Sequence, residues 1–310
     1  MEWYHIVLII FFVIFILFFL FTYICFKKTF YSKNKKRNTD EIYVPDDEIH
    51  QEYKETIYQD VKDIRKLGHT PYSITSFDGL KLGAKYFECI KGAPIEIMFH
   101  GYRGNAEIDL STGVKRAFKC GRNVLLVSQR GGSGSEGHII SFGINERHDC
   151  VEWAKFVVKE FGSDVKIILT GVSMGAATVL MAGSMDLPSN VIGIIADCGY
   201  NEPKDIILKV IVDMKLPPKL IYPFIKLSAK IFGKFDLEEY SPFESVQKMK
   251  VPVFFVHGSG DTYVPCYMSE KLYAACNSKK VLVTIKDGKH GTAYMKDPET
   301  YIEELNKFFK

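Results

Sequence analysis

The stretch Val165-Lys166-Ile167-Ile168-Leu169-Thr170-Gly171-Val172-Ser173-Met174-Gly175 decides the fold of this chain. Its apolar part is typical of a buried strand, and the small and apolar residues 176–182 that follow are typical of a helix beneath a parallel sheet. A strand that passes through G-x-S-x-G directly into a helix is a nucleophile elbow. The turn is so tight that the serine backbone is strained and both flanking positions must be glycine. The pattern therefore predicts a Ser173 hydroxyl that stands clear of the sheet, although a serine between glycines also occurs in surface turns.

Two later loops carry an acid and a histidine, in the chain order Ser, Asp, His that accompanies a nucleophile elbow. The strand-like run 253–258 leads into Asp261, and the run 281–285 leads into His290. A histidine with an ordinary pKa of ~6.5 can take the proton of a serine hydroxyl and return it near neutrality. A carboxylate beside the histidine fixes the imidazole tautomer and stabilises the cation that forms. The sequence thus predicts Ser173 as nucleophile, His290 as general base and acid, and Asp261 as the orienting acid.

Other residues compete for these roles. Asp197 follows the strand-like run 191–196 and is the second candidate for the acid, while Asp261 could instead be a turn-forming residue. For the base, the sequence has no histidine downstream of Asp261 except His290. His100 and His257 each end a strand-like run before a glycine, so we expect them to shape loops rather than to transfer protons.

The ordered combination of elbow, acid loop and histidine loop resembles the α/β-hydrolase superfamily, from about Tyr72 to the C-terminus. It is most similar to the serine aminopeptidase and lysophospholipase-like bacterial hydrolases, which share loops of the kind seen around Asp261 and His290. The resemblance implies a mostly parallel eight-stranded sheet with helices on both faces and a helical cap inserted after the sixth strand. Neither a cofactor nor a metal ion is expected.

Backbone N–H groups should stabilise the oxyanion that forms during acyl transfer. In this fold one of them belongs to the residue after the nucleophile, here Met174. The second comes from the loop after an earlier strand, which is His100-Gly101-Tyr102-Arg103-Gly104-Asn105 following the apolar run 95–99. By resemblance to the family's His-Gly motif, Tyr102 supplies this N–H. Each such donor contributes on the order of 3 kcal/mol to stabilising the transition state.

A glycine-rich segment suggests an alternative function, dinucleotide binding. The pattern G-x-G-x-x-G is matched by Gly132-Ser133-Gly134-Ser135-Glu136-Gly137. A dinucleotide site needs a helix to open at once and an acid at the next strand end, about 20 residues further on. The residues 138–142 intervene instead. We interpret the segment as the loop that follows an arginine beside the active site in the similar hydrolases. Those proteins often have Asp where this chain has Ser128, which puts the anchoring of the loop in question.

The second strong signal is N-terminal. Residues 3–26 are almost wholly apolar, and no charged residue lies between Ile6 and Phe26. About two dozen residues at ~1.5 Å each span ~36 Å, enough to cross the ~30 Å hydrocarbon core of a bilayer. A cleaved signal peptide has a basic start, a shorter apolar stretch and a small-residue cleavage site, whereas this segment begins Met1-Glu2 and is bulky throughout. Residues 1–26 are therefore predicted to be an uncleaved transmembrane anchor.

Basic residues follow the apolar segment directly, at Lys27, Lys28, Lys33, Lys35, Lys36 and Arg37. The positive-inside rule predicts a single-pass cell membrane protein with its catalytic domain on the cytoplasmic side. The same cluster could bind anionic lipid or form a solvated linker. The chain has 40 basic and 37 acidic residues, and because the basic excess is local to this stem, no nucleic-acid partner is expected. Seven scattered cysteines without metal-ligand spacing suit a reducing compartment.

We divide the chain into a transmembrane anchor at residues 1–26, a basic stem at 27–45 and an α/β-hydrolase domain at 46–310. Strand-like runs alternate with helical segments after a predicted hairpin at Asp78-Gly79, which indicates a mainly parallel sheet. An excess of helical sequence at about 201–249 is expected to form the cap. Apolar residues and lysines alternate there at helical spacing, so the cap could form an acyl pocket near the membrane surface or simply pack on the sheet.

These features predict a membrane-anchored serine hydrolase that cleaves a carboxylic ester or thioester of an acyl or lipid-like substrate through an acyl-enzyme. One alternative is a serine peptidase of the aminopeptidase-like branch, which would need acidic cap residues such as Glu238 and Glu239 to bind the peptide amine. Another is a non-catalytic scaffold on a hydrolase fold, against which the complete set of three catalytic residues argues. Fold by itself does not set the substrate.

Overall fold

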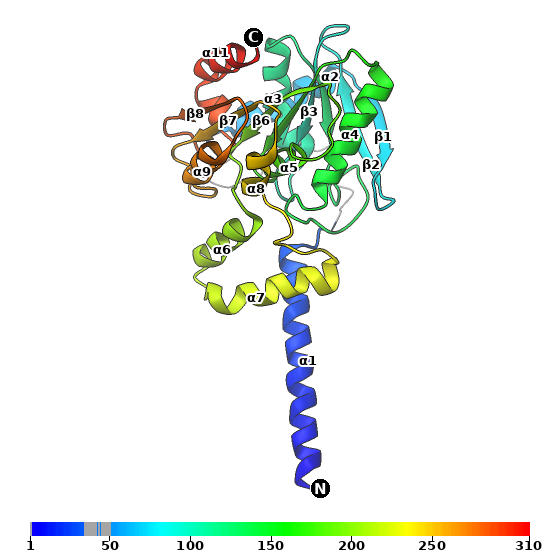
Figure 1. The fold of residues 1–310 in the computed structure, drawn as a ribbon, viewed down its shortest axis with the longest axis vertical. Helices are drawn as coiled ribbons and strands as arrows, with labels where there is room; N and C mark the ends of the chain where they lie inside the picture. The colour runs from blue at the N-terminus through cyan, green and yellow to red at the C-terminus, as the bar shows by residue number, and fades with distance from the viewer. Residues whose placement is uncertain (1, 34–41, 43, 45–50) are drawn as a thin grey trace.

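One sheet of eight strands organises the described part of the chain, which comprises residues 2–33, 42, 44 and 51–310 of this computed structural model. The strands are β1 (Thr70–Thr75), β2 (Lys81–Phe87), β3 (Ile95–Phe99), β4 (Asn123–Val127), β5 (Ile167–Val172), β6 (Val191–Asp197), β7 (Val253–Gly258) and β8 (Lys280–Ile285). They lie in the order β1-β2-β4-β3-β5-β6-β7-β8 (Figure 1). The pairs β1–β2 and β2–β4 are antiparallel and every later pair is parallel. The predicted mostly parallel sheet is confirmed.

Helices cover both faces of this sheet (Figure 1). One face packs against α4 (Glu146–Phe161), α5 (Met174–Ala182), α8 (Pro242–Lys248) and α9 (Tyr267–Ala275). The other face packs against α3 (Ala106–Lys119), α10 (Ala293–Lys296) and α11 (Pro298–Phe309), and α2 (Lys54–Lys66) lies outside α3. This is the three-layer arrangement that alternating strands and helices predict.

The central strands are continuous apolar runs because they are covered on both sides. Along β3, Ile97 and Phe99 point into one core and Met98 into the other. Glu96 is the exception in this run. Its fully buried carboxylate is paired with Arg116 at 2.6 Å and with Arg122 at 2.7 Å.

The predicted cap follows β6, the sixth strand. It consists of α6 (Pro203–Asp213), α7 (Pro218–Ser228) and a π-helical turn, Ala229–Gly233. Figure 1 shows α6 and α7 below the hydrolase domain, with α7 crossing the long helix α1 (Trp3–Thr29). The last helix of the predicted cap region, α8, packs on the sheet beside α5 instead.

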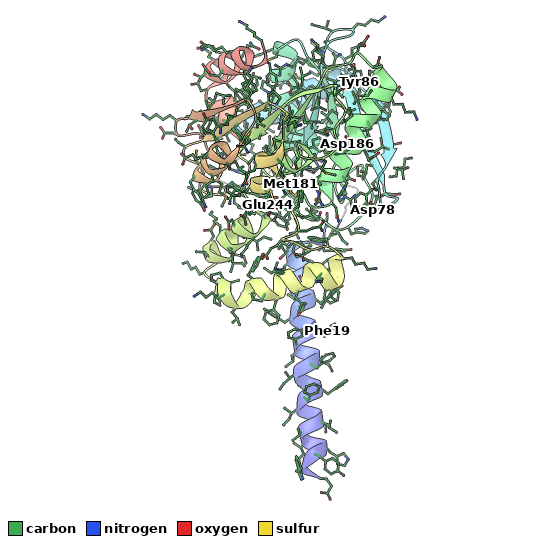
Figure 2. The ribbon with its side chains drawn as sticks, in the orientation of Figure 1. Phe19, Asp78, Tyr86, Met181, Asp186 and Glu244 are labelled. Carbon is green, nitrogen blue, oxygen red and sulfur yellow. The ribbon has the colours of Figure 1, made fainter. Side chains whose placement is uncertain are left out.

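Helix α1 projects from the domain, and most of its side chains are exposed (Figures 1 and 2). It is long and apolar enough to cross a membrane. It also ends later than the sequence predicts, at Thr29 rather than Phe26. Its last turn carries Lys27 and Lys28, cations that interact favourably with a helix C-terminus.

The first residues of the predicted stem are not a linker. Phe30 is fully buried in the apolar cluster that also holds Phe142 and Phe235. The backbone then pairs with the domain, since Ile140 N donates to Phe30 O at 2.8 Å and Ser32 N donates to His138 O at 2.7 Å. Aromatic side chains and backbone hydrogen bonds therefore join residues 30–32, which fall in the predicted stem, to the domain built on the sheet. Most of the remaining stem lies outside the described residues.

Candidate active site

Ser173 lies at the junction of β5 and α5 in the backbone conformation that a nucleophile elbow requires. Its φ is 57° and its ψ is −117°, which is a strained combination for a residue with a side chain. A Cβ atom on Gly171 would lie 2.1 Å from the carbonyl group of Gly175, and one on Gly175 would lie 2.0 Å from Phe99 O. Both glycines are therefore required by direct contact with the backbone, as the sequence pattern predicts.

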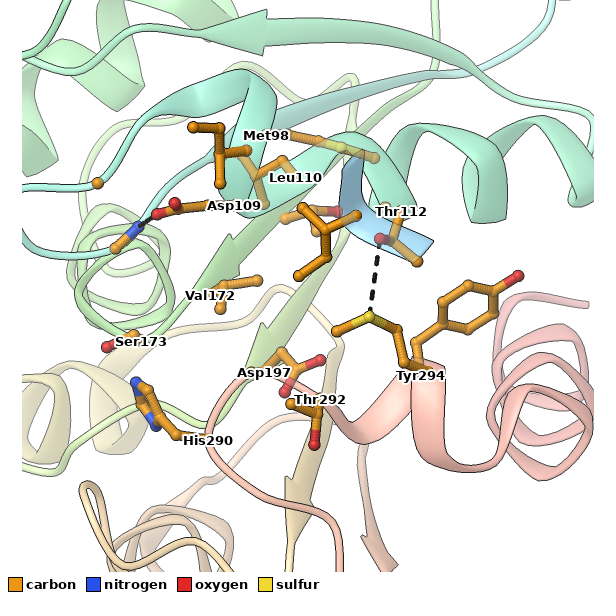
Figure 3. Close-up of a pocket in the computed structure, with 18 of the residues that line it drawn as sticks. Met98, Asp109, Leu110, Thr112, Val172, Ser173, Asp197, His290, Thr292 and Tyr294 are labelled. Carbon is orange, nitrogen blue, oxygen red and sulfur yellow. Dashed lines mark hydrogen bonds between the residues drawn. The ribbon is translucent and has the colours of Figure 1, made fainter. Parts of the chain in front are cut away.

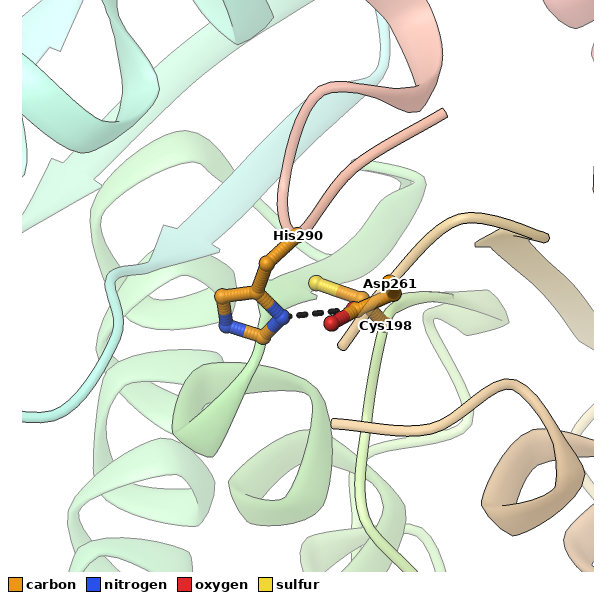
Figure 4. Close-up of side chains that lie close together, drawn as sticks. All are labelled: Cys198, Asp261 and His290. Atoms are coloured by element: carbon orange, nitrogen blue, oxygen red, sulfur yellow. Dashed lines mark hydrogen bonds and ion pairs between the residues drawn. The ribbon is translucent and has the colours of Figure 1, made fainter. Parts of the chain in front are cut away.

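The loops after β7 and β8 bring Asp261 and His290 together. The Nδ1 atom of His290 lies 2.7 Å from Asp261 Oδ2 (Figure 4). The other carboxylate oxygen, Oδ1, accepts the backbone N–H groups of Tyr263 at 2.9 Å and Val264 at 2.8 Å. Burial opposes the charged form of Asp261, but hydrogen bonds from His257 and His290 hold the pKa of this carboxyl well below its usual range. Asp261 is thus a fixed anion beside the imidazole.

Ser173 and His290 line the same cavity, which has a volume of about 400 Å³. Figure 3 shows the imidazole of His290 next to the Ser173 side chain at one end of this cavity. No hydrogen bond joins the two side chains in the described part of the chain. Catalytic hydrogen bonds of this kind are often open without substrate and close when substrate binds.

Asp197, the competing acid, occupies a different position. Its backbone carbonyl accepts the N–H of Ser173 at 2.9 Å, so β6 supports the elbow directly. Its side chain is buried deeper in the cavity, where Oδ2 lies 3.4 Å from the hydroxyl of Tyr301 and Oδ1 has no partner among the described residues. Burial raises the pKa of Asp197 to about 6. The carboxylate that accepts a hydrogen bond from His290 Nδ1 is that of Asp261, the first choice from the sequence, and not that of Asp197.

The loop after β3 lies against the elbow. A Cβ atom on Gly101 would be 3.6 Å from Ser173 Cβ. The backbone N–H groups of Tyr102 and Met174, the two predicted oxyanion donors, have no acceptor among the described residues. Free donors beside a candidate nucleophile are what an oxyanion hole needs.

Asp109, on the first turn of α3, organises this loop and was not singled out from the sequence. Its carboxylate accepts the N–H of Gly101 at 3.2 Å and that of Asn105 at 3.3 Å. Asn105 in turn caps α3 by accepting the N–H of Glu107 at 3.0 Å. An Asn cap followed four residues later by Asp is a local signal that could have identified the arrangement.

The two other strand-end histidines differ in role. His100 Nε2 accepts the N–H of Gln129 at 3.1 Å and its Nδ1 lies 2.9 Å from Gly101 O, so it shapes loops as predicted. His257 also bonds within its own loop, but its Nε2 lies 3.1 Å from Asp261 Oδ2 as well. His257 is therefore a second partner of the candidate catalytic acid, a contact that the sequence did not reveal.

No helix follows directly after the glycine-rich loop of residues 128–137. The loop therefore lacks the helix N-terminus that a dinucleotide site requires. The loop is anchored even though Ser128 stands where the similar hydrolases often have Asp. Arg130 holds it by ion pairs to Asp149 at 2.7 Å and to Asp78 at 2.9 Å. The hydroxyl of Ser135 adds a hydrogen bond to Ser128 O at 2.5 Å.

The cavity does not lie under the cap. Its apolar wall comes from β3, α3, β5 and α10, through Met98, Ile108, Leu110, Val172 and Met295 (Figure 3), and no residue of 201–249 contributes to it. The cavity thus lies on the α3 side of the sheet and not beneath the cap, where the sequence offered an acyl pocket as one alternative. Glu238 and Glu239, the candidate amine-binding residues, bond to Lys226 and Arg147 away from this cavity.

Cys198, Asp261 and His290 place three donor atoms within 4.8 Å of one another, a spacing that could hold a metal ion (Figure 4). Burial raises the pKa of the Cys198 thiol well above its usual value, which opposes the thiolate that a metal ligand must become. The Nδ1 atom of His290 is already bonded to Asp261. This chemistry fits a neutral thiol beside an acid–base pair better than a metal centre.

Comparison with known proteins finds similarity to hydrolases. A family model described as "Serine hydrolase (FSH1)" matches residues 214–292, which contain Asp261 and His290. The uncharacterized protein YqkD of Bacillus subtilis (strain 168) is 27% identical over 189 residues, which cover 61% of this chain and 62% of YqkD. The match thus spans about three-fifths of the length of that relative.

Two solved structures share the fold at low sequence identity. The esterase Pf2001 of Pyrococcus furiosus has a TM-score of 0.65 at 22% identity, covering 80% of this chain and 92% of that one. Est1E of Butyrivibrio proteoclasticus, solved with ferulic acid bound, has a TM-score of 0.59 at 19% identity, covering 76% and 97% of the two chains. The chain therefore has the α/β-hydrolase fold, and part of it, residues 214–292, matches a serine hydrolase family model.

Proposed function

We propose that this chain is a membrane-anchored serine hydrolase that cleaves a carboxylic ester or thioester of an acyl substrate. One observation carries the proposal: a strained Ser173 shares a cavity with His290, whose other ring nitrogen is bonded to Asp261. A scaffold would gain nothing from holding Ser173 in a costly backbone conformation beside this pair.

The chemistry follows from these positions. His290 Nε2 takes the hydroxyl proton as Ser173 Oγ attacks the substrate carbonyl carbon, and the carbonyl oxygen becomes an oxyanion. The N–H groups of Tyr102 and Met174 donate to that oxygen. As the intermediate collapses, the imidazolium returns its proton to the leaving alcohol or thiol, and an acyl-enzyme remains. Water, deprotonated by His290, then releases the carboxylic acid and restores Ser173. Asp261 stabilises the imidazolium in both halves of the cycle.

The substrate class is inferred from the cavity wall, which is mostly apolar next to Ser173. An acyl chain fits such a wall, whereas the acidic cap residues that a peptide amine would need are already paired elsewhere. The esterases among the structural relatives support the same choice. A panel of p-nitrophenyl esters, acyl thioesters and peptide anilides tests it on the full chain in detergent. Faster turnover of anilides than of esters would overturn the ester assignment.

The membrane part of the proposal is supported by the contact between α1 and the cap. Phe224 of α7 packs on Phe18 and Phe21, with ring centroids 5.4 and 4.8 Å apart, and Phe232 packs on Tyr23 at 5.3 Å. Phe21 precedes Lys27 by six residues, or about 9 Å along the helix. An amphipathic helix in a membrane interface is buried by about 5–10 Å. With Lys27 at the membrane surface, α7 would lie in that interface.

Exposed side chains on the cap agree with this placement. Leu220 is 60% exposed and Met214 63%, and Lys215, Lys219 and Lys230 lie on the same segment. Alkaline carbonate extraction of membranes should leave the full chain in the pellet, and protease treatment of sealed vesicles should show the hydrolase domain on the cytoplasmic side. Extraction into the supernatant would overturn the anchor. In inside-out vesicles, whose cytoplasmic face is outside, added protease should digest the hydrolase domain and leave only the short N-terminal side of the anchor protected. Protection of the hydrolase domain in these vesicles would reverse the sidedness.

A further inference from the structure

The loop that carries the proposed oxyanion donor is bonded directly to the end of the membrane helix. The hydroxyl of Tyr102 donates to Thr29 O at 2.6 Å. The guanidinium of Arg103 donates to Lys28 O at 2.8 Å and to Tyr31 O at 3.0 Å. Two consecutive residues of this loop thus bond to the last two backbone carbonyls of α1 and to a third carbonyl just after the helix.

These contacts meet a requirement of α1 itself. The last four carbonyls of an α-helix have no partner within the helix, and its C-terminus carries a partial negative charge. Phe26 O accepts the N–H groups of Phe30 and Tyr31, which satisfies one of them. Tyr102 and Arg103 supply donors to the carbonyls beyond it, and the arginine also adds a positive charge at the helix end. The loop is therefore the C-terminal cap of the membrane helix.

Aromatic packing makes the connection rigid as well as polar. The Tyr102 ring stacks on Phe142 at 5.0 Å, and Phe142 packs edge-on against Phe30 at 5.9 Å. Phe30 has no exposed surface. Burial raises the pKa of Tyr102 to about 12, so its hydroxyl remains a hydrogen-bond donor at physiological pH.

The other side of the same loop faces the nucleophile. Gly101 lies against Ser173, and the free N–H of Tyr102 is the proposed second oxyanion donor. Arg103 has a φ of 54°, a left-handed backbone conformation that costs energy for a residue with a side chain. Asp109 holds one side of this loop through the N–H groups of Gly101 and Asn105, and the side chains of Tyr102 and Arg103 bond the loop to the end of α1.

We infer that the C-terminal end of α1 positions the oxyanion donor, so that the anchor is a structural part of the active site as well as a tether. This inference rests on the proposed function. The Tyr102 hydroxyl and the Arg103 guanidinium are positioning groups, since they bond to α1 rather than to reacting atoms. An enzyme whose helix end is detached from the loop keeps its Ser173, His290 and Asp261 but loses catalytic rate.

The test uses the full chain in detergent and a short, soluble ester, p-nitrophenyl butyrate, whose delivery does not depend on a membrane. Tyr102→Phe removes one hydroxyl and keeps the ring stacking, and Arg103→Ala removes the guanidinium. Each should lower kcat about tenfold and leave KM within twofold, since complete loss of an oxyanion donor costs about 10²–10³ in kcat. Arg103→Lys, which keeps a cation at the helix end, should recover part of the loss.

Tyr222→Phe is the matched control, because the Tyr222 hydroxyl bonds to Glu238 in the cap at 2.7 Å. It should stay within twofold of the wild type in kcat. Hydrogen exchange supplies a readout independent of turnover. In Tyr102→Phe the amides of Gly101 and Gly104, which are hydrogen-bonded in the wild type, should exchange at least tenfold faster, while those of α5 are unchanged, which also shows that the variant is folded.

Wild-type kcat and unchanged exchange in both Tyr102→Phe and Arg103→Ala would overturn the inference and leave the proposed function intact. A wild-type chain that neither turns over esters nor reacts at Ser173 with a fluorophosphonate would instead overturn the proposed function. Equal loss of kcat in Tyr222→Phe would overturn the positioning role, because the effect would then not be specific to the loop.

Discussion

The imidazole of His257 lies 3.1 Å from Asp261 Oδ2, the same carboxylate oxygen that faces His290 at 2.7 Å. The Nε2 atom of His257 also lies 2.8 Å from Val264 O, and because both neighbours are acceptors, this nitrogen carries the hydrogen. Its Nδ1 is 2.7 Å from the hydroxyl of Ser269. His257, which is itself bonded to Ser269, therefore gives the candidate acid a second hydrogen-bond donor.

Replacing His257 by leucine should weaken this support. Loss of its hydrogen bond should raise the pKa of Asp261 toward the ordinary value. The stability that Asp261 contributes is present above the unfolded pKa of ~3.9 and is lost as the pH falls through the folded pKa. Acid unfolding of His257→Leu, followed by circular dichroism, should thus begin at a higher pH than in the wild type. An unchanged acid midpoint would show that His257 does not hold Asp261; Ser269→Ala, one bond further away, should give a smaller shift.

The stability effect of Asp197 should depend on pH in the direction opposite to that of Asp261. Burial raises its pKa to about 6, against ~3.9 in an unfolded chain, so the folded state binds more protons between these values and loses stability as the pH rises through them. Asp197→Asn removes this effect. The unfolding free energy of Asp197→Asn minus that of the wild type, measured by urea titration, should rise by roughly 2–3 kcal/mol from pH 4 to pH 8. Parallel pH profiles for the two proteins would contradict the assignment.

Substitution of Glu96 tests how much the buried charge cluster beneath the cavity contributes to stability. Its carboxylate has no exposed surface and is bonded to Arg116, Arg122 and the hydroxyl of Thr170. Glu96→Gln leaves two buried guanidinium groups without their anion, which costs about 3–5 kcal/mol of unfolding free energy. Glu152→Gln, which breaks an exposed pair with Lys155, should cost under about 0.5 kcal/mol. Comparable losses in the two variants would contradict the role given to burial.

The geometry of the nucleophile elbow predicts that substitution by alanine has very different effects on stability at two glycines. Gly175→Ala would place a Cβ atom 2.0 Å from Phe99 O, so the variant should fail to fold or lose most of its stability. Gly113, inside α3, has its nearest neighbour, Met98 Sδ, at 3.6 Å from the added carbon. Gly113→Ala should therefore keep or raise the melting temperature, because alanine favours helix by up to about 1 kcal/mol. A stable Gly175→Ala protein with wild-type melting would refute the geometry described for the elbow.

The parts of the site that the sequence predicts are those fixed by local sterics. Gly171, Ser173 and Gly175 are dictated by a turn in which backbone contacts leave room for no other residue. Asp261 and His290 follow apolar runs that can only be buried strands, and the ends of parallel strands meet at one edge of the sheet. The local sequence therefore predicts which residues form the candidate site.

Other features depend on packing between distant segments. The lysines after the anchor suggest a solvated stem, yet Phe30 completes an aromatic cluster formed by residues more than a hundred positions away. The cavity lies toward α3, where Met98 and Val172 are among the residues that line it, and no periodicity in the cap reveals this position. The contact between His257 and Asp261 likewise depends on the curvature of one loop.

The central claim is that Ser173 is an activated nucleophile. The full chain in detergent should be treated with a fluorophosphonate probe, beside Ser173→Ala and the matched control Ser184→Ala, whose hydroxyl bonds to Tyr240 away from the cavity. Mass spectrometry should find the label on Ser173 in the wild type and in Ser184→Ala, and on no residue in Ser173→Ala. Absence of label from folded wild-type protein, or equal labelling of Ser173→Ala, would contradict the claim.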